Sequence, residues 1–127
     1  MASLPLISVV DDDDSVRESL QRLLRSAGFA VQVFATAEDL LNSAYLHQTR
    51  CLILDVRMPA MDGFELYREL RKSNSGVPVI FITAHGNEGS RSQALNEGAI
   101  DYLYKPFSEE SLLRAIEAAL RLEAIKT

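Results

Sequence analysis

The sequence of 127 residues predicts an α/β fold in which helices cover both faces of a single parallel β-sheet. Short apolar runs alternate five times with amphipathic helical patterns, which is the order expected of repeated β-α units. Three of these runs have almost no polar residues, which is typical of strands that are buried on both faces. The length fits one domain, which we expect to span residues 1–127.

The predicted strands are the five apolar runs, each of strand length and rich in Val, Ile, Leu or aromatic residues. They cover residues 6–10, 30–34, 51–55, 78–83 and 99–104. Parallel strands of this kind align their carboxyl ends, and the functional crevice of such a sheet lies beyond that edge. The residues at or directly after the strand ends are therefore the first candidates for a site.

The first three helices carry start signals. Ser15 and Glu18 fit a capping box, and Gly28 is expected to end the first helix. Thr36 and Asp62 are the expected N-cap residues of the next two helices.

The last two helical segments differ in how strongly the pattern supports them. The helix expected over 108–124 has a full apolar stripe. The segment 87–98 has a thin one, because Ser90 and Ser92 stand where a packed helix would prefer apolar side chains.

Composition limits the classes of partner. The net charge of −5 argues against a protein that binds nucleic acids through their phosphate backbones. The single cysteine, Cys51, lies within an apolar run and can form no internal disulfide, so a reducing compartment is expected. No run approaches 18 apolar residues and no signal-peptide pattern opens the chain, so we expect a cytoplasmic protein that does not enter a membrane.

Polar residues that suit phosphoryl chemistry stand at the ends of four strands. They are Asp11 and Asp12 after the first strand, Asp55 in the third, Thr83 in the fourth and Lys105 after the fifth. Three carboxylates at one edge would repel one another unless a cation neutralised them, and oxygen-only donors favour Mg²⁺. A lysine and a threonine would suit an anion beside that metal. The pattern therefore predicts carboxylates, a divalent metal and a phosphoryl group.

The run of four aspartates at 11–14 needs an explanation, because two carboxylates about 4 Å apart repel by roughly 4 kcal/mol at an effective dielectric constant near 20. An acidic run alone is more often a solvated loop than a metal site. The shared position at one sheet edge with other polar residues favours a metal site for Asp11 and Asp12. Asp13 is expected at the rim, where it adds negative field, and Asp14 at the start of the helix, where the dipole favours a negative charge.

The chain also resembles a known family. The resemblance rests on four strings, which are VVDDDDSVRESL, LILDVRMPAMDGFEL, VIFITAHG and GAIDYLYKPF. In order and spacing they resemble the receiver domain of two-component response regulators, most of all the FixJ type, from about Leu6 to about Leu122. The resemblance implies a CheY-like, flavodoxin-like (βα)5 doubly wound fold with strand order 2-1-3-4-5.

The resemblance implies a phosphoryl switch that is not an enzyme in the usual sense. Asp55 would be the phosphoacceptor for a sensor histidine kinase or a phosphotransfer protein, and the domain would promote its own phosphorylation and dephosphorylation. Thr83 and Lys105 would contact the phosphoryl oxygens. The implied ligands for Mg²⁺, or for Mn²⁺, are Asp11, Asp12, Asp55 and the backbone carbonyl of Arg57.

Thr83 and Tyr102 would form the moving parts of the switch, with the aromatic ring changing between an outward and an inward position. A cis peptide is expected before Pro106. Arg57 and His85 would tune the lifetime of the phosphoryl group. The positions implied to flank the site are Asp13, Met58, Pro59, Ala84, His85 and Pro106.

Two departures from the usual pattern of the family bear on the switch. Ser90 and Ser92 replace apolar residues, so we expect the helix within 87–98 to be loosely packed, and mobile or partly unwound, before phosphorylation. Tyr102 stands where phenylalanine is frequent. Since a buried tyrosine hydroxyl needs a partner, we expect Tyr102 to favour the outward position.

The resemblance also implies partners. On phosphorylation, the face formed by residues 87–107 and the last helix would change shape and control an output domain or partner, with transcription as the expected output. A homodimer through that face is one expected arrangement. The domain itself is expected to make no direct contact with nucleic acid.

Three other classes of protein remain as alternatives. A Mg²⁺-dependent phosphohydrolase would need a second acid two residues after its aspartyl nucleophile, where this chain has Arg57. A flavin-binding module would need a hydroxyl- or glycine-rich loop after the first strand, where four aspartates would repel a phosphate. A degenerate receiver that only binds partners is disfavoured by the complete set of site residues.

Overall fold

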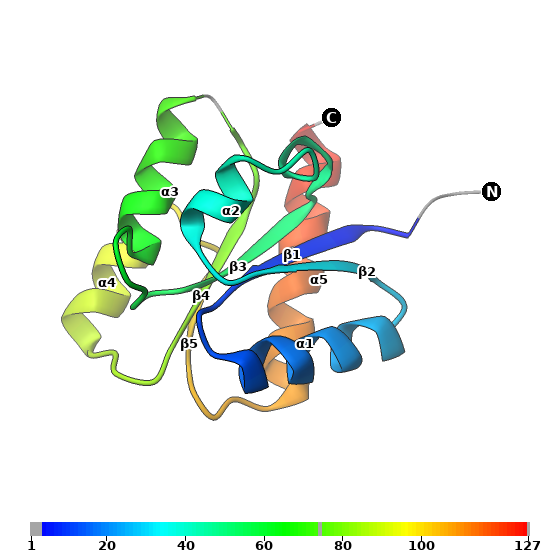
Figure 1. Ribbon diagram of the computed structural model, residues 1–127, viewed down its shortest axis with the longest axis horizontal. Coiled ribbons are helices and arrows are strands. Elements are labelled where there is room, and N and C mark those ends of the chain that lie inside the picture. The colour runs from blue at the N-terminus through cyan, green and yellow to red at the C-terminus, as the bar shows by residue number, and fades with distance from the viewer. Residues whose placement is uncertain (1–3, 74, 127) are drawn as a thin grey trace.

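The computed structural model describes residues 4–73 and 75–126, with side chains as far as residue 122. These residues contain a five-stranded parallel sheet in the order β2-β1-β3-β4-β5, which confirms the predicted fold and strand order (Figure 1). The strands are β1 (Leu6–Val10), β2 (Ala30–Phe34), β3 (Cys51–Asp55), β4 (Val79–Thr83) and β5 (Asp101–Tyr104).

Helices enclose the sheet on both faces. They are α1 (Asp14–Ser26), α2 (Ala37–Leu41), α3 (Gly63–Lys72), α4 (Glu88–Asn96) and α5 (Glu109–Lys126), with the 3₁₀ helix η1 (Leu46–Gln48) before β3. Helices α1 and α5 cover one face, and α2, α3 and α4 cover the other (Figure 1). The last helix differs slightly from its predicted range of 108–124, because Ser108 lies outside it and caps it, accepting a hydrogen bond from Ser111 N–H at 3.0 Å.

Alternate side chains of the central strands enter two separate cores. Ile53 belongs to the core that contains Leu24 of α1 and Ile116 of α5, whereas its neighbour Leu54 belongs to the core that contains Leu66 of α3. All five side chains are fully shielded from solvent. This packing fixes the register of each strand, because a shift by one residue would exchange the two sets of side chains. The position of each strand end is fixed with it.

The strand boundaries agree with the sequence analysis except at two amino ends. β4 begins at Val79 rather than at 78, and β5 begins at Asp101 rather than at 99. Pro78 has no N–H to donate to the sheet. The N–H of Ala99 donates to the carbonyl of Ala94, so it closes the end of α4 instead of joining β5.

The helix caps confirm two predictions and correct a third. Thr36 and Asp62 are the N-caps of α2 and α3, as expected. The capping box predicted for Ser15 and Glu18 is wrong, because Asp13 is the N-cap of α1 and its carboxylate accepts hydrogen bonds from two N–H groups of the first turn. The carboxylate of Asp13, two residues before Ser15, is the N-cap that the sequence pattern assigned to Ser15.

Helix α4 is a complete helix over its nine residues, so the expectation of a partly unwound segment is wrong for this structure. The thin apolar stripe is confirmed, since Ala94 is the one residue of α4 that is buried. Polar contacts take the place of apolar packing at its carboxyl end, where the carboxylate of Glu97 accepts two hydrogen bonds from Arg68 on α3.

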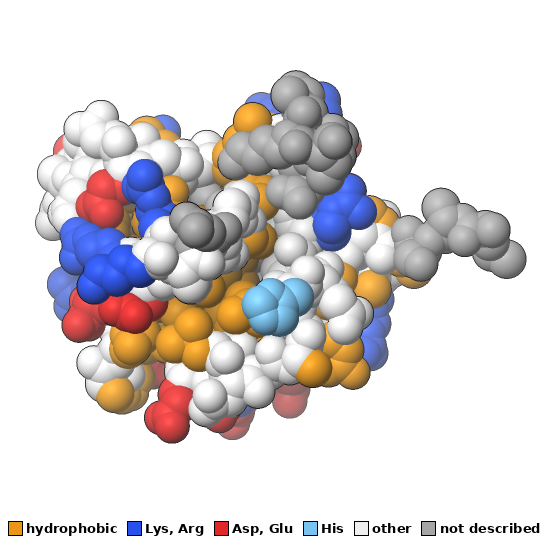
Figure 2. All heavy atoms as spheres, turned by 90° about the horizontal axis from the view of Figure 1, so that it is seen from above, with side chains coloured by type: hydrophobic (Ala, Val, Ile, Leu, Met, Phe, Trp, Pro, Cys, Tyr) orange, Lys and Arg blue, Asp and Glu red, His pale blue; other side chains and the backbone are white. Residues whose placement is uncertain are grey.

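The surface shows apolar as well as charged regions. Figure 2 shows a face on which apolar side chains reach the surface in a central hollow, with acidic and basic side chains around it. Within the described residues, no helix has both the length and the apolar character needed to cross a membrane.

A buried pair of hydroxyl groups ties the segment before β3 to β1. The Thr49 hydroxyl donates to the carbonyl of Tyr45 at 2.8 Å, and the Ser8 hydroxyl oxygen lies 2.7 Å from that of Thr49. Because the Thr49 proton is already used, Ser8 is the donor in the second bond. Ser8 is fully shielded from solvent.

Thr49→Val keeps the shape of the side chain and removes the acceptor of the Ser8 hydroxyl. We expect the free energy of unfolding, measured by urea denaturation, to fall by about 1–3 kcal/mol, because a buried donor loses its partner. The double variant Ser8→Ala/Thr49→Val should recover most of this loss. Equal destabilisation of the single and double variants would contradict this account of the pair.

Candidate functional site

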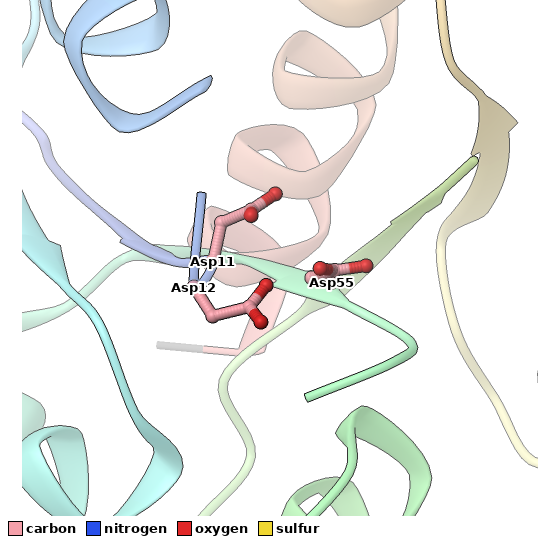
Figure 3. Close-up of side chains that lie close together, drawn as sticks. All are labelled: Asp11, Asp12 and Asp55. Carbon is pink, nitrogen blue, oxygen red and sulfur yellow. The ribbon is translucent and has the colours of Figure 1, made fainter. Parts of the chain in front are cut away.

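Three carboxylates meet at the carboxyl edge of the sheet. Asp11 and Asp12 follow β1, and Asp55 ends β3, which is the neighbour of β1 in the sheet. One oxygen atom of each carboxylate lies within 4.8 Å of those of the other two (Figure 3). Asp11 and Asp55 are buried, whereas Asp12 is exposed. The structure therefore brings together the predicted acidic cluster, with Asp12 as its solvent-facing member.

One ammonium group lies against this cluster. Lys105, which follows β5, places Nζ 2.8 Å from Asp11 Oδ2 and 3.8 Å from Asp55 Oδ2. Its backbone N–H donates to the carbonyl of Thr83 at 2.7 Å, which ties the end of β5 to the end of β4. The peptide bond between Lys105 and Pro106 is cis, as the resemblance implied.

Thr83 ends β4 at the same edge. Its neighbour Ile82 is the register partner of Asp55 on β3, so the two strands end side by side. The Thr83 side chain is buried, and its hydroxyl oxygen accepts a hydrogen bond from the N–H of His85 at 3.1 Å. The hydroxyl thus lies at the sheet edge that carries the acidic cluster.

The surroundings of Asp55 raise the pKa of its carboxyl group from 3.8 to about 6. Burial is the largest cause, because it removes water from the charged form, and the negative charge of Asp11 raises the pKa further. Lys105 and a hydrogen bond from the N–H of Arg57 lower the pKa and offset part of this effect. Near pH 7 the group is mostly ionised, in a site that disfavours its charge.

The donor set fits a divalent metal ion. Three carboxylates face one ammonium group, so the cluster carries an excess of negative charge when all are ionised. The side-chain atoms that converge are oxygens, which Mg²⁺ and Mn²⁺ prefer as ligands. A divalent cation held among them would offset the repulsion between Asp11 and Asp55.

The loop after β3 folds back on itself, and this requires a glycine. The N–H of Gly63 donates to the carbonyl of Val56 at 2.9 Å, and a Cβ atom at position 63 would lie 2.4 Å from the backbone oxygen of Asp55. Any larger residue would displace the backbone that carries Asp55. The sequence analysis did not single out Gly63, although an Asp-Gly pair is a common mark of such a turn.

The positions expected to flank the site take different roles. Asp13, expected at the rim, serves as the cap of α1. Met58 is half-buried and packs against the core that contains α3. Arg57 is exposed, and its carbonyl as a metal ligand stays a prediction. The other flanking residues, all exposed, are Pro59, Ala84, His85 and Pro106.

Tyr102 lies inward, so the expected outward position is wrong for this structure. Its side chain is 2% exposed, and its hydroxyl donates to Ser90 Oγ at 2.9 Å. Ser90, which the sequence analysis treated as a weak point of α4, supplies the partner that a buried tyrosine hydroxyl needs. A Cβ atom at Gly86 would lie 2.4 Å from the Tyr102 hydroxyl oxygen and 2.6 Å from Thr83 Cγ2, so the glycine leaves room for both side chains.

Sequence reasoning also missed Arg17, whose Nη1 donates to the backbone carbonyl of Asp11 at 2.7 Å. The available signal was a basic residue just after the acidic run. A pattern of side chains does not reveal a contact with a backbone atom, so the role of Arg17 could be found only in the structure.

Asp55→Asn should stabilise the metal-free protein near pH 7. Because the pKa of Asp55 is higher in the folded protein than in the unfolded chain, the folded state binds more protons between pH 3.8 and about 6, and its stability falls as the pH rises through that window. We expect the variant to gain about 1–2 kcal/mol at pH 7, less than the full shift implies because the buried amide of asparagine also loses its contacts with water.

Urea denaturation in EDTA between pH 4 and pH 8 measures this effect as the difference between wild type and Asp55→Asn. Glu117→Gln is the matched control, because it removes an exposed carboxylate on α5, outside the acidic cluster. A difference that stays constant across the range would contradict the raised pKa.

The chain is similar in sequence and fold to known proteins. Residues 7–117 match the response regulator receiver domain. The chain is 44% identical over 117 residues to the response regulator protein TodT of Pseudomonas putida, covering 92% of this chain and 52% of TodT. It is 40% identical over 115 residues to the transcriptional regulatory protein FixJ of Bradyrhizobium diazoefficiens, covering 91% of this chain and 56% of FixJ.

A crystal structure described as FixJ-N is 37% identical, with a TM-score of 0.83, and covers 95% of this chain and 96% of that one. The chain spans about half the length of the curated relatives it matches. The matched region includes the acidic cluster, Thr83 and Lys105, which stand together at the carboxyl edge of the shared fold. The chain therefore belongs to the response regulator receiver domain family of two-component systems.

Proposed function

We propose that Asp55 accepts a phosphoryl group from a phosphohistidine of a sensor kinase or a phosphotransfer protein, and that the domain thereby acts as a reversible switch. The observation that carries the proposal is the position of the Asp55 carboxylate, buried beside Asp11 and Asp12 and 3.8 Å from Lys105 Nζ. The pKa of the Asp55 carboxyl group, about 6, leaves the group mostly ionised near pH 7, as a nucleophile must be.

The proposed transfer replaces a P–N bond with a P–O bond. An oxygen of Asp55 attacks phosphorus in line with the imidazole nitrogen of the donor, which leaves with the bonding electrons and takes up a proton. When bound, Mg²⁺ or Mn²⁺ supplies positive charge that neutralises the oxygens of the transferred group. The residues proposed to hold the metal are Asp11, Asp12, Asp55 and the carbonyl of Arg57.

Lys105 and Thr83 are proposed to contact the phosphoryl oxygens. The ammonium group of Lys105 already lies between two carboxylates, where a phosphorylated Asp55 would present further anionic oxygens. The Thr83 hydroxyl accepts from His85 and keeps its own proton for donation. The product is a mixed anhydride that water can hydrolyse, which makes the modification reversible. In this proposal the domain also promotes its own dephosphorylation and is a phosphoacceptor switch, not an enzyme in the usual sense.

Tyr102 and Ser90 are proposed to connect this site to α4. Thr83 and Tyr102 both border Gly86, so a movement of the threonine toward the phosphoryl group changes the space available to the tyrosine ring. In the inward position, the hydrogen bond to Ser90 joins Tyr102 to the first turn of α4. The bond therefore stabilises the inward position, and an outward turn of the ring would break it.

The proposed partners follow from this chemistry and from the relatives. A histidine kinase supplies the phosphoryl group, and because it draws that group from ATP, the proposed site of action is the cytoplasm. TodT and FixJ are named as regulators and are about twice as long as the matched region, which supports a transcriptional output domain. We propose that the face formed by residues 87–107 and α5 controls this output, including through a homodimer, without binding nucleic acid directly.

Incubation with a small phosphodonor and Mg²⁺ tests the proposed acceptor. We expect the intact mass to rise by one acid-stable, base-labile phosphoryl group, because an acyl phosphate is cleaved by base. The adduct should be absent in Asp55→Asn and in the wild type with EDTA. Asp62→Asn is a matched control, since it changes an aspartate outside the acidic cluster, and it should still be modified.

Three other outcomes would contradict the proposal. No adduct in the presence of Mg²⁺ would indicate a receiver that signals without phosphate. An adduct that persists in Asp55→Asn would move the acceptor to another residue. Steady turnover of a free phosphomonoester would favour the phosphohydrolase.

Ser90→Ala should weaken binding of beryllofluoride, a mimic of the phosphoryl group, in the presence of Mg²⁺. Loss of one hydrogen bond, with a net value of about 0.5–1.5 kcal/mol, shifts the ring away from the inward position and should raise the apparent Kd about two- to tenfold. The change in tyrosine fluorescence on titration measures this Kd.

Two further variants isolate the hydrogen bond. Ser92→Ala, an exposed serine of the same helix, should leave the Kd unchanged. In the Tyr102→Phe background, Ser90→Ala should have no further effect, because the hydroxyl that it serves is already gone. Equal effects of Ser90→Ala in both backgrounds would show that Ser90 acts by another route.

A further inference from the structure

Arg17 reaches back from the first turn of α1 to the start of the acidic run. Its Nη1 donates to the backbone carbonyl of Asp11 at 2.7 Å, and its Nη2 forms an ion pair with the carboxylate of Asp14. The Arg17 side chain is 17% exposed, whereas that of Asp14 is 84% exposed. The guanidinium group is therefore packed against the turn between β1 and α1. The exposed carboxylate of Asp14 pairs with it on the solvent side.

The contact with Arg17 completes the set of hydrogen bonds that hold Asp11. The N–H of Asp11 donates to the carbonyl of Phe34 at 3.1 Å. Its carboxylate accepts from the N–H of Asp13 at 2.9 Å and from Lys105 Nζ at 2.8 Å. Arg17 supplies the partner of the one remaining polar atom, the backbone carbonyl oxygen.

That carbonyl also controls the next residue. The carbonyl of Asp11 and the N–H of Asp12 belong to one planar peptide unit, so fixing the direction of the oxygen fixes the rotation of the whole plane. Asp12 is exposed, and its direction must come largely from its backbone. Figure 3 shows Asp11 and Asp12 leaving adjacent points of the chain, with Asp55 nearby on β3.

We propose that Arg17 is a positioning residue for divalent-metal binding: it holds the Asp11–Asp12 peptide so that the carboxylate of Asp12 faces Asp55. This inference rests on the proposed function, because it concerns the metal site of that switch. Arg17 makes its contacts with the backbone carbonyl of Asp11 and with the carboxylate of Asp14, and neither is among the three converging carboxylates of the cluster. It therefore acts through the backbone and not on the metal.

Charge and positioning predict opposite results when Arg17 is replaced. Removal of a positive charge beside an acidic cluster strengthens the attraction for Mg²⁺ by Coulomb's law. Loss of the carbonyl contact instead frees the peptide plane and weakens binding. Loss of a group that orients a metal ligand typically lowers metal affinity about 10- to 100-fold. The sign of the change in Kd therefore distinguishes the two effects.

Calorimetric titration of Mg²⁺ into wild type, Arg17→Met and Arg17→Lys tests the inference. Methionine keeps the apolar stem without a donor, and lysine keeps the charge but lacks the planar fork that spans a carbonyl and a carboxylate. We expect the Kd for Mg²⁺ to rise about tenfold in Arg17→Met. It should rise about threefold in Arg17→Lys, which keeps one donor.

Arg22→Met is the matched control. It removes the same charge from an exposed position of the same helix, so its Kd should equal that of wild type or be slightly lower. The free energy of unfolding of each variant in EDTA is measured alongside. A role limited to the stability of α1 would lower this free energy and leave the Kd of the folded protein unchanged.

Several results would overturn the inference. One is a Kd for Mg²⁺ in Arg17→Met that is equal to or lower than the Kd in Arg22→Met. Another is a Kd in Arg17→Lys equal to that of wild type. The third is a loss of stability in the Arg17 variants without a change in their Kd. If Arg17→Met fails to fold, Arg17→Lys decides by itself. Absence of Mg²⁺ binding by the wild type would be distinguishable from these results, because it would overturn the proposed metal site and this inference together.

Discussion

Two carboxylates buried side by side, those of Asp11 and Asp55, share one ammonium group, and the rest of the site depends on this imbalance. Buried charge is costly unless it is paired, and Lys105 pairs with only part of the negative charge present. Burial, and after it the negative charge of Asp11, raises the pKa of Asp55, and the excess of carboxylates leaves oxygen atoms suited to a divalent cation. The sheet tolerates this arrangement because two apolar cores hold the strand ends in place.

The four consecutive aspartates have different roles because each has different surroundings. Asp11 accepts a hydrogen bond from Lys105, and Asp12 is the exposed member of the acidic cluster. Asp13 accepts hydrogen bonds from the first turn of α1, and Asp14 pairs with Arg17. The repulsion expected of such a run is thus relieved at three of its members by an ammonium group, by backbone N–H groups and by a guanidinium group. The fourth, Asp12, is left available.

Polar contacts also hold α4 against the rest of the domain. Helix α4 buries little apolar surface, and its ends depend on Ser90 and Glu97 for contacts with β5 and α3. A helix held by a few hydrogen bonds can change partners at lower cost than one held by a packed apolar face. The Tyr102 hydroxyl has its hydrogen-bond partner, Ser90, on α4, which is the helix that the proposed switch must move.

The sequence by itself determined the strands, their alternation with helices and the five polar residues at the sheet edge. These follow from short-range patterns, because a strand buried on both faces must be apolar along its length and its end must turn polar. The tertiary structure decided that Asp13 and not Ser15 caps α1, that Tyr102 points inward to Ser90, and that Arg17 reaches the carbonyl of Asp11. Each of these is a choice between hydrogen-bond partners of similar strength, and only the folded backbone brings one of them within reach.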